Sequence, residues 1–334
     1  MTSTLLAAQF LVCAALIARA GFVLSQSGDR LAEMHGWGRG WVGLALLASV
    51  TSLPELSSGI SAVTLVDAPN LAVGNALGAC VVNLGFLVIV DALQRRQPMY
   101  REAAAVHLLS AAFAVVMLGF VALSLQVGAR APSLFQVGAF SPLLFGLYLL
   151  ALRSVQAHSA QNEAAPDAGA APPERDARRR EWRRFGVAAA VVVAAGLWLP
   201  EVADRLATQL QLSRSFVGTI FMALVTTLPE MAVTLSALRL GALDMAIGNL
   251  LGSCLFNVMI LAIEDLFYRH GPLLSAVDPV HASTAVTAMV MSALVIVGLL
   301  MRPQGRVLRV ASWVSVGLVA AYLVNAALVF LAAG

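Results

Sequence analysis

Two short segments combine residue types that could bind a cation inside an otherwise apolar chain. VTSLPE occupies residues 50–55 and VTTLPE occupies residues 225–230. Each places hydroxyls, a proline and a glutamate within a long hydrophobic run. Proline has no N–H, so the carbonyls of Val50 and Val225, four residues earlier, lose their helical partners. Freed carbonyls, hydroxyls and carboxylates are hard oxygen ligands, which suit Ca²⁺, Na⁺ or Mg²⁺ rather than soft transition metals.

Glu55 and Glu230 each lie deep inside one of these hydrophobic runs. A carboxylate at that depth in a membrane costs roughly 3 kcal/mol or more, which makes it a candidate functional group. Two such carboxylates that meet would repel each other unless a cation or protons lay between them. The alternative is a protonated glutamate that bonds to a neighbouring helix.

Two further segments, GNALGACVVN at 74–83 and GNLLGSCLFN at 248–257, carry matching polar stripes. In each, two glycines four residues apart form the small-residue pattern that allows helices to approach closely. Positions four and eight residues apart share one helix face. The stripes consist of Asn75, Ala79 and Asn83 in the first segment and Asn249, Ser253 and Asn257 in the second. We favour ligation for Asn83 and Asn257, whereas interhelical hydrogen bonding suits Asn75 and Asn249 equally well.

The composition is that of an integral membrane protein. Of 334 residues, 60% are hydrophobic and 12% are charged, whereas soluble domains carry about 25% charge. The net charge of +3 is too small and scattered for a nucleic-acid-binding protein. Cys13, Cys80 and Cys254 lie in apolar runs, which indicates neither a disulfide framework nor a zinc cluster.

Ten segments are long and apolar enough to cross a membrane. They lie near 4–26, 37–65, 70–93, 103–125, 134–153, 185–209, 212–237, 242–267, 280–301 and 307–332. The N-terminal segment is interpreted as a first membrane helix rather than a cleaved signal. Residues 154–184 are rich in Ala, Pro and charge and form a polar connector. This divides the chain into a first unit at 1–153, the connector at 154–184 and a second unit at 185–334.

Arginine distribution predicts the orientation. With the N-terminus outside, the inner loops hold 16 arginines and the outer loops 4, while Arg19 lies within the first span. Positive residues accumulate on the cytoplasmic side. Both termini are therefore predicted outside and the 154–184 loop in the cytoplasm. The arginines from 175 to 184 serve as this topology signal or contact anionic lipid.

The two halves repeat each other. DRLA at 29–32 matches DRLA at 204–207, and the two LPE motifs have the same offset of 175. The GN segments and the pair Asp91 and Asp265 match at an offset of 174. Because each unit has an odd number of spans, the second must enter the membrane inverted. Inverted repeats are typical of secondary transporters, with the substrate site near the midplane. The predicted fold is thus an all-α membrane protein of ten helices in two inverted five-helix repeats, with Pro-broken helices at a midplane ion site.

Other charged residues are less specific. Asp91 and Asp265 could line an ion access path, or could cap helices or lie at the interface. Glu201 and Glu264 are predicted to be interfacial. The sequence has no nucleophile elbow, no Walker-type loop and no dinucleotide fingerprint. No enzyme activity and no bound cofactor are expected.

With both pairs of motifs in place, the chain resembles the cation/calcium exchanger superfamily, and most of all bacterial sodium/calcium exchangers. The resemblance implies that Glu55 and Glu230 coordinate the transported cations. It further implies that hydroxyls and carbonyls before each proline, and polar residues on the GN helices, complete the shell. Those implied ligands are Thr51, Ser52, Thr226, Thr227, Ser253, Asn83 and Asn257, together with the carbonyls of Ala48 and Ala223.

The chain departs from that family pattern at several positions. The usual glycine before the TSLPE core is Val50 and Val225, and the first-repeat serine is Ala79. Cys80 and Cys254 replace a usual asparagine. Loss of the hydroxyl at Ala79 bears on sodium binding more than on a divalent site built from two glutamates.

The sequence as a whole predicts a secondary antiporter of the bacterial inner membrane that exchanges Ca²⁺ for Na⁺ by alternating access. H⁺ in place of Na⁺, or Mg²⁺, Mn²⁺ or a monovalent pair as substrate, remain alternatives on the same scaffold. A membrane enzyme that uses the paired glutamates as acid and base, or a passive channel, is a rival from another class. The expected partners are the transported cations and membrane lipid, without nucleic acid or an obligate protein partner.

Overall fold

The computed structural model describes residues 3–34, 48–94, 97–130, 133–160, 175–307 and 310–332, and this part of the chain is almost entirely helical. The elements of the first half are α1 (Ser3–Met34), α3 (Ala48–Thr51), α4 (Leu53–Thr64), α5 (Pro69–Leu93), α6 (Met99–Glu102), α7 (Val106–Val127), η2 (Gly128–Arg130), β1 (Ser133–Leu134), β2 (Val137–Gly138) and α8 (Phe140–Ala160). Those of the second half are α9 (Arg175–Leu210), α10 (Arg214–Phe216), η3 (Val217–Met222), α11 (Ala223–Thr226), α12 (Leu228–Arg239), α13 (Leu243–Phe267), η4 (Leu273–Ser275), α14 (Val280–Met301) and α15 (Trp313–Leu331).

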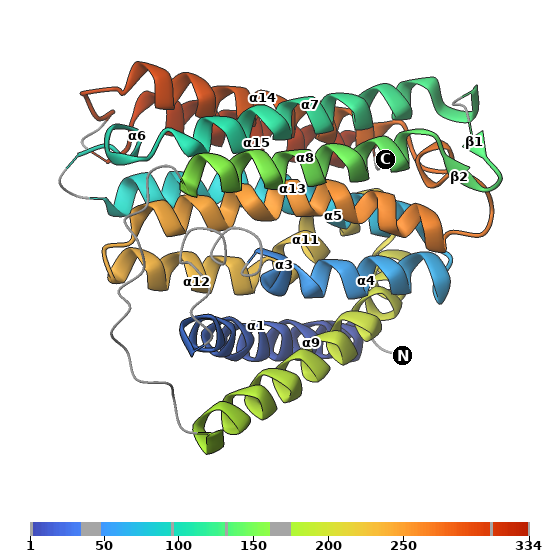
Figure 1. Ribbon diagram of the computed structural model, residues 1–334. Helices are drawn as coiled ribbons and strands as arrows, with labels where there is room; N and C mark the ends of the chain where they lie inside the picture. The colour runs from blue at the N-terminus through green and yellow to red at the C-terminus, as the bar shows by residue number, and fades with distance from the viewer. Residues whose placement is uncertain are drawn as a thin grey trace.

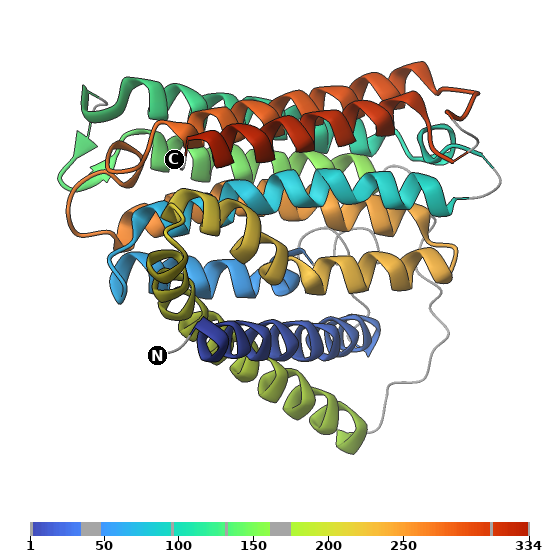
Figure 2. The ribbon, with the colours of Figure 1, turned by 180° about the vertical axis from the view of Figure 1, so that it is seen from behind.

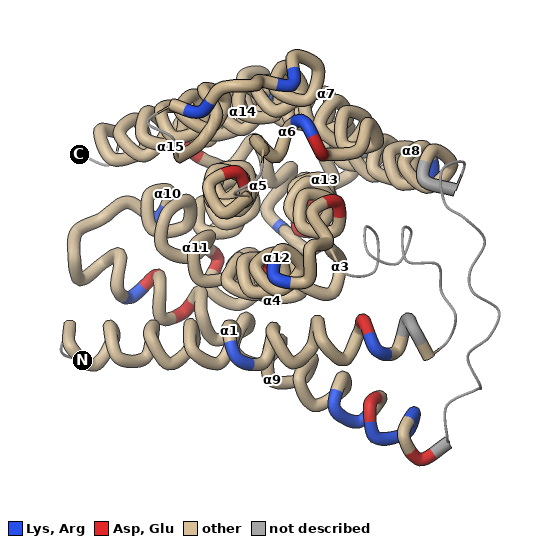
Figure 3. Tube along the Cα trace, turned by 90° about the vertical axis from the view of Figure 1, so that its left-hand side faces the viewer, with Lys and Arg blue, Asp and Glu red and all other residues tan. Residues whose placement is uncertain are grey.

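The helices form layers around a central antiparallel pair, α5 and α13 (Figure 1). On one side lie α7, α8, α14 and α15. On the other side lie the short helices α3, α4, α11 and α12, and beyond them α1 and α9, as the view from behind also shows (Figure 2). Seen from one end, α5 and α13 occupy the middle of the bundle (Figure 3). Their apolar residues face protein on almost every side, and 18 residues of α5 and 20 of α13 are buried. A helix that is apolar all round is suited to such a position.

Eight described helices are long and apolar enough to cross a membrane, and the bent pair Arg214–Thr226 and Leu228–Arg239 makes a ninth candidate. These nine correspond to nine of the ten predicted segments. The remaining one, at 37–65, lies partly outside the described residues, because only its part from residue 48 onward is described. The protein is therefore an integral membrane protein of helical class.

Two predicted spans begin later than their hydropathy indicated. The segment at 134–153 opens with a hairpin of β1 and β2, in which Phe135 adopts a left-handed conformation, and helix α8 begins at Phe140. The segment at 307–332 opens with a bridge between Val307 and Ala311. Hydropathy does not detect these turns, because apolar residues extend the run on either side of them.

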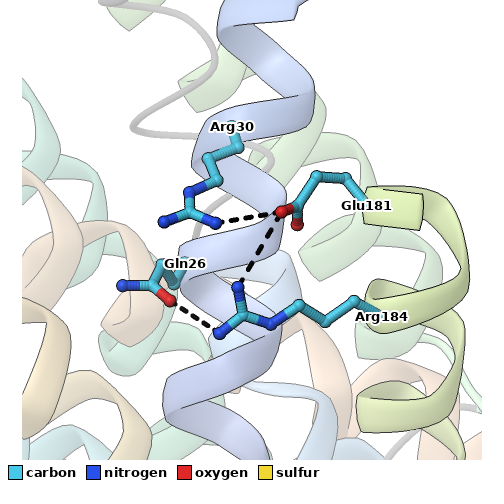
Figure 4. A network of polar contacts seen from close by, with 4 residues as sticks. All are labelled: Gln26, Arg30, Glu181 and Arg184. Atoms are coloured by element: carbon cyan, nitrogen blue, oxygen red, sulfur yellow. Dashed lines mark hydrogen bonds and ion pairs between the residues drawn. The ribbon is translucent and has the colours of Figure 1, made fainter. Parts of the chain in front are cut away.

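The predicted connector at 154–184 is helical at both ends, since α8 continues to residue 160 and α9 begins at residue 175. The start of α9 is held against α1 by a polar network (Figure 4). Arg30 Nη1 donates to Glu181 Oε1 at 2.9 Å, and Arg184 Nη2 donates to Gln26 at 2.8 Å. Arginine, alanine and glutamate favour helices. The charged stretch at 175–184 therefore continues helix α9 beyond its apolar part instead of forming a loop.

The glycines of the GN segment allow α5 to contact the broken helix of the second half closely. A Cβ atom at Gly78 would overlap the carbonyl oxygen of Thr219 and lie 2.8 Å from the Cβ of Ala223. Gly85, further along α5, has only Tyr322 Cδ2 nearby, at 3.5 Å. The close approach at Gly78 places α5 directly against the segment that leads into the second LPE motif.

We expect Gly78→Ala to lower the free energy of unfolding by roughly 1–3 kcal/mol, because the added methyl group would push α5 away from η3. The measurement is the apparent melting temperature in detergent, with Gly85→Ala as the matched control on the same helix. Equal melting temperatures for the two variants would contradict the close packing described for Gly78.

Candidate cation site

Two helix breaks, one in each half, form the centre of the site. α3 ends at Thr51 and α4 begins at Leu53, and the residue between them, Ser52, has φ −85° and ψ 13°. Thr227 occupies the matching position between α11 and α12, with φ −81° and ψ 0°. Each break is followed by a proline in the first turn of the next helix, and the second break bends the chain by 41°. The predicted Pro-broken helices are thus confirmed in the local geometry.

Glu55 and Glu230 follow these breaks by one turn, and both side chains are 0% exposed. The two carboxyl groups are close enough to interact electrostatically with each other. Both oxygens of Glu55 and Oε2 of Glu230 have no hydrogen-bond partner among the described residues. An ionised carboxylate that is buried without partners costs several kcal/mol. The pair therefore requires a cation or protons.

The hydroxyl groups at the breaks bond either to a carboxyl group or to backbone carbonyls. Ser52 Oγ donates to Glu230 Oε1 at 2.9 Å, so a residue of the first half binds the glutamate of the second. The equivalent hydroxyl of Thr227 instead donates to the carbonyl of Ala223 at 2.8 Å. Thr51 and Thr226 donate to the carbonyls of Ala48 and Ala223 respectively, at 3.2 and 3.3 Å. The two predicted carbonyl ligands are therefore engaged inside their own helices in this structure.

Asn83, Asn257 and Ser253 carry further unpartnered polar atoms on the central helices. All three are 0% exposed, and neither the amide groups of the asparagines nor the hydroxyl of Ser253 has a partner among the described residues. Ser253 lies close enough to Glu230 to interact with its carboxyl group. Ala79, at the position that matches Ser253, instead packs with Val82 and Ala223 in a small apolar cluster. The site is thus polar on the second-half side and apolar at Ala79.

Asn75 and Asn249 are hydrogen-bonded between helices. Asn75 donates to Ser58 Oγ at 3.1 Å and accepts from Thr226 Oγ1 at 3.0 Å. Asn249 donates to the carbonyl of Glu230 and to Thr234 Oγ1, both at 3.2 Å. These hydrogen bonds fix α5 and α13 to the broken helices, while Asn249 Oδ1 has no partner among the described residues.

The two cysteines of the GN segments contact each other reciprocally. Cys80 Sγ is 3.5 Å from the carbonyl oxygen of Cys254, and Cys254 Sγ is 3.5 Å from that of Cys80. The sequence identified these residues only as replacements for asparagine. Their reciprocal contact marks the place where α5 and α13 cross.

Asp91 and Asp265 are anchors for loops rather than parts of the ion site. Asp91 accepts from the N–H groups of Met99 and Ser312 and from the Ser315 hydroxyl, at 2.7–2.9 Å. Asp265 accepts in the same way from Gly138, Ser141 and Leu273. Of the predicted alternatives, capping describes both residues, since each ties loop backbone to a central helix.

The prediction for Glu264 is wrong. It was expected at the interface, because it lies near the end of its span, but its side chain is 0% exposed. The carboxyl group turns inward against α4, where Gly59 leaves space for it. Glu201, by contrast, is partly exposed and pairs with Arg205 at 2.6 Å, as an interfacial residue would.

These features describe a helical membrane protein with a buried oxygen-rich site at two broken helices. The chain matches the family model described as sodium/calcium exchanger protein over residues 5–153 and 182–331. It therefore belongs to the sodium/calcium exchanger protein family.

The sequence identity to individual relatives is low. The chain is 26% identical over 220 residues to the inner membrane protein YrbG of Escherichia coli, and the alignment covers 66% of either chain. It is 27% identical over 225 residues to the putative antiporter CaxA of Alkalimonas amylolytica, covering 65% of this chain and 66% of that protein. Both alignments thus span slightly less than two thirds of the relative. The solved structure of the sodium-calcium exchanger NCX_Mj soaked with 10 mM Na⁺ and zero Ca²⁺ matches with a TM-score of 0.64 and 21% identity, over 98% of this chain and 99% of that one. This last likeness shows the fold.

We expect Asp91→Ala to lower the free energy of unfolding by about 3 kcal/mol or more, because three donors would lose their acceptor in a buried place. Cation affinity should stay within about threefold, since Asp91 takes no part in the site. Glu102→Ala, on the exposed side of the same loop region, serves as the control. A loss of cation binding in a folded Asp91→Ala protein would contradict the anchoring role.

Proposed function

We propose that this protein is a secondary antiporter that exchanges Ca²⁺ for Na⁺ across the cytoplasmic membrane by alternating access. The observation that carries the proposal is the set of buried, unpartnered polar groups around the helix breaks. Glu55 and Glu230 stand at its centre, with Asn83, Ser253 and Asn257 on the central helices. Ca²⁺ binds six to eight hard oxygens, and this set supplies carboxylate, amide and hydroxyl oxygens within one buried region.

The architecture that we propose is ten membrane helices in two inverted repeats of five. It is supported by the matching breaks at Ser52 and Thr227, the antiparallel course of α5 and α13 (Figure 1) and the reciprocal contact of Cys80 with Cys254. In such a frame the site lies near the midplane, where either repeat can close one side of it. We place both termini outside and the 154–184 connector in the cytoplasm, as the arginine distribution predicts.

Coupling follows from the charge of the two glutamates. The empty site holds two carboxyl groups that are costly to keep ionised without a cation. Movement of the empty, doubly charged site between its two open states is therefore unfavourable, whereas the cation-loaded site can cross. Ca²⁺ and its counter-ions compete for the same carboxylates, which makes the flux of one depend on the other.

A second candidate is H⁺ as counter-ion, and the apolar surroundings of Ala79 favour it. Sodium bound on that side would need an oxygen where this chain has a methyl group next to Val82 and Ala223. Protons require no such shell, because they bind to the carboxyl groups themselves. The methyl group of Ala79 affects a divalent site less than a sodium site, since the carboxylates of the divalent site come from Glu55 and Glu230.

The experiment is ⁴⁵Ca²⁺ uptake into proteoliposomes loaded with Na⁺, loaded with acid, or without any gradient. We expect uptake driven by the Na⁺ gradient and its loss to the protein-free background in Glu55→Gln and Glu230→Gln, because each substitution removes a carboxylate ligand. Glu201→Gln, which alters an exposed glutamate of α9, should transport as the wild type does.

Three outcomes are informative. Uptake driven only by the acid load would assign H⁺ as counter-ion. Uptake without any gradient would indicate a passive channel. Absence of ⁴⁵Ca²⁺ uptake under all three conditions would reject Ca²⁺ as the substrate, and the same protocol would then be run with Mg²⁺ and Mn²⁺.

A further inference from the structure

Glu264 is a buried carboxyl group that the proposed cation site does not use. It lies on α13, seven residues beyond Asn257, and its side chain is 0% exposed. Neither of its oxygens has a hydrogen-bond partner among the described residues. A Cβ atom at Gly59 would overlap Glu264 Oε1, so the carboxyl group points at α4 and occupies the space that this glycine leaves.

Along the two helices, Glu264 lies at a level between the cation site and a cavity. Gly59 follows Glu55 by four residues on α4, which is about 6 Å along the helix axis and on the same face. In the opposite direction, Thr64, Asp265 and Tyr268 help to line a cavity of about 490 Å³. Along the helix axes, Glu264 thus lies between the level of Glu55 and this cavity, which is lined by its neighbour Asp265 and not by Glu264 itself. The predicted orientation places the cavity on the outer side of the membrane.

The two halves of the protein differ at this place. By the offset that pairs Asp91 with Asp265, the counterpart of Glu264 is Val90, which is buried and apolar. By the offset that pairs Glu55 with Glu230, the counterpart of Gly59 is Thr234, which accepts a hydrogen bond from Asn249. The positions that match Glu264 and Gly59 by symmetry therefore hold Val90, in the first half, and Thr234, in the second. The fold does not require a carboxyl group at this position, since the matching position in the first half holds Val90.

The charged and titratable groups on the elements packed against α13 leave Glu264 without a cationic partner. Asp265 and Asp91 are bound to loop N–H groups, and His107 of α7 pairs with Asp244 at the beginning of α13, 20 residues before Glu264. Tyr148 of α8 meets the ring of Phe256 edge to face. The remaining groups on these elements are Glu55 on α4, Cys80 on α5, Cys254 on α13 itself, Glu230 and Arg239 on α12, and Arg153 and His158 on α8. Along α4, the negative charge nearest to Gly59, and so to the carboxyl group of Glu264, is that of Glu55, one turn away.

The surroundings fit a proton better than a metal ion. A divalent cation requires six or more oxygen ligands. The hydroxyls that α4 offers near Gly59 are already engaged, since Ser57 and Ser58 donate to the carbonyl of Pro54 and Ser61 donates to that of Leu197. A carboxyl group without partners in apolar surroundings is stable as the neutral acid.

We propose that Glu264 is a proton-binding site coupled electrostatically to the cation site. While the cation site is empty, the charge of Glu55 and Glu230 favours the protonated acid. When a divalent cation binds, the potential at Glu264 becomes more positive, the O–H bond dissociates, and the proton passes to water in the adjoining cavity. The carboxylate that remains then faces a cation site whose charge has risen from −2 to 0, so the repulsion that favoured its protonation is removed. The inference rests on the proposed function for the identity of that cation.

The test is infrared difference spectroscopy of the purified full-length protein in detergent, with and without Ca²⁺. We expect C=O stretching bands of protonated carboxylic acids in Ca²⁺-free wild-type protein, one component of which is missing in Glu264→Gln and decreases in the wild type when Ca²⁺ is added. In weakly buffered solution, Ca²⁺ should release about one proton fewer per bound ion from Glu264→Gln than from the wild type. Glu201→Gln is the control for a glutamate outside the site.

The double variant Glu264→Val with Gly59→Thr introduces the residues of the symmetry-related pair of positions, Val90 and Thr234, and serves as a second test if Glu264→Gln folds poorly. It should lose the same component and bind Ca²⁺. Identical carboxyl bands in wild type and Glu264→Gln would overturn the proposal, as would loss of Ca²⁺ binding in a folded Glu264→Gln protein, which would make Glu264 a cation ligand. If the wild type binds no Ca²⁺, the proposed function fails, yet the Glu264 component in Ca²⁺-free protein still decides whether Glu264 holds a proton.

Discussion

The structure depends on the burial of two carboxyl groups beside broken backbone in a region without bulk water. Neither Glu55 nor the ends of the helices at Ser52 could face lipid, because unsatisfied backbone and charge are tolerated at membrane depth only inside protein. The four short helices α3, α4, α11 and α12 must therefore be covered on every side. α5 and α13 cover one side, and α1 and α9 lie on the other. The layered order of the molecule follows from this requirement.

The close packing of the central helices meets the same requirement. Some polar atoms at the breaks are paired, either across helices, as Asn75 is with Ser58, or within one helix, as Thr51 is with Ala48, whereas others, as in Glu55, are left for an ion. Small residues such as Gly78 bring the backbones together so that water has little space. The division between paired and unpaired groups separates the residues that maintain the frame from those that can exchange ligands.

Sequence reasoning predicted the long helices and the breaks well, because hydropathy over about 20 residues and the proline after each break are local properties. It also selected a set of site residues that are all buried, from Thr51 to Asn257. It was wrong on Glu264, because the distance from the end of a span does not reveal which way a side chain turns. The space for that side chain comes from Gly59, more than 200 residues earlier in the chain. The sequence also did not predict that Asp91 anchors loops. Its donors at Met99 and Ser312 belong to segments whose packing no local pattern encodes.

The reciprocal contact between Cys80 and Cys254 is self-complementary, because each thiol faces the carbonyl of the other residue. Two identical copies of either half could meet at this point as the two different halves do, provided that one copy were inserted upside down. Such an arrangement corresponds to a homodimer of opposite topologies. In the fused chain the arginines are predicted to hold each half in a fixed orientation, which would leave the halves free to accumulate different residues. Position 264 holds a carboxyl group, whereas the matching position in the other half holds Val90. A symmetric dimer could not maintain this difference.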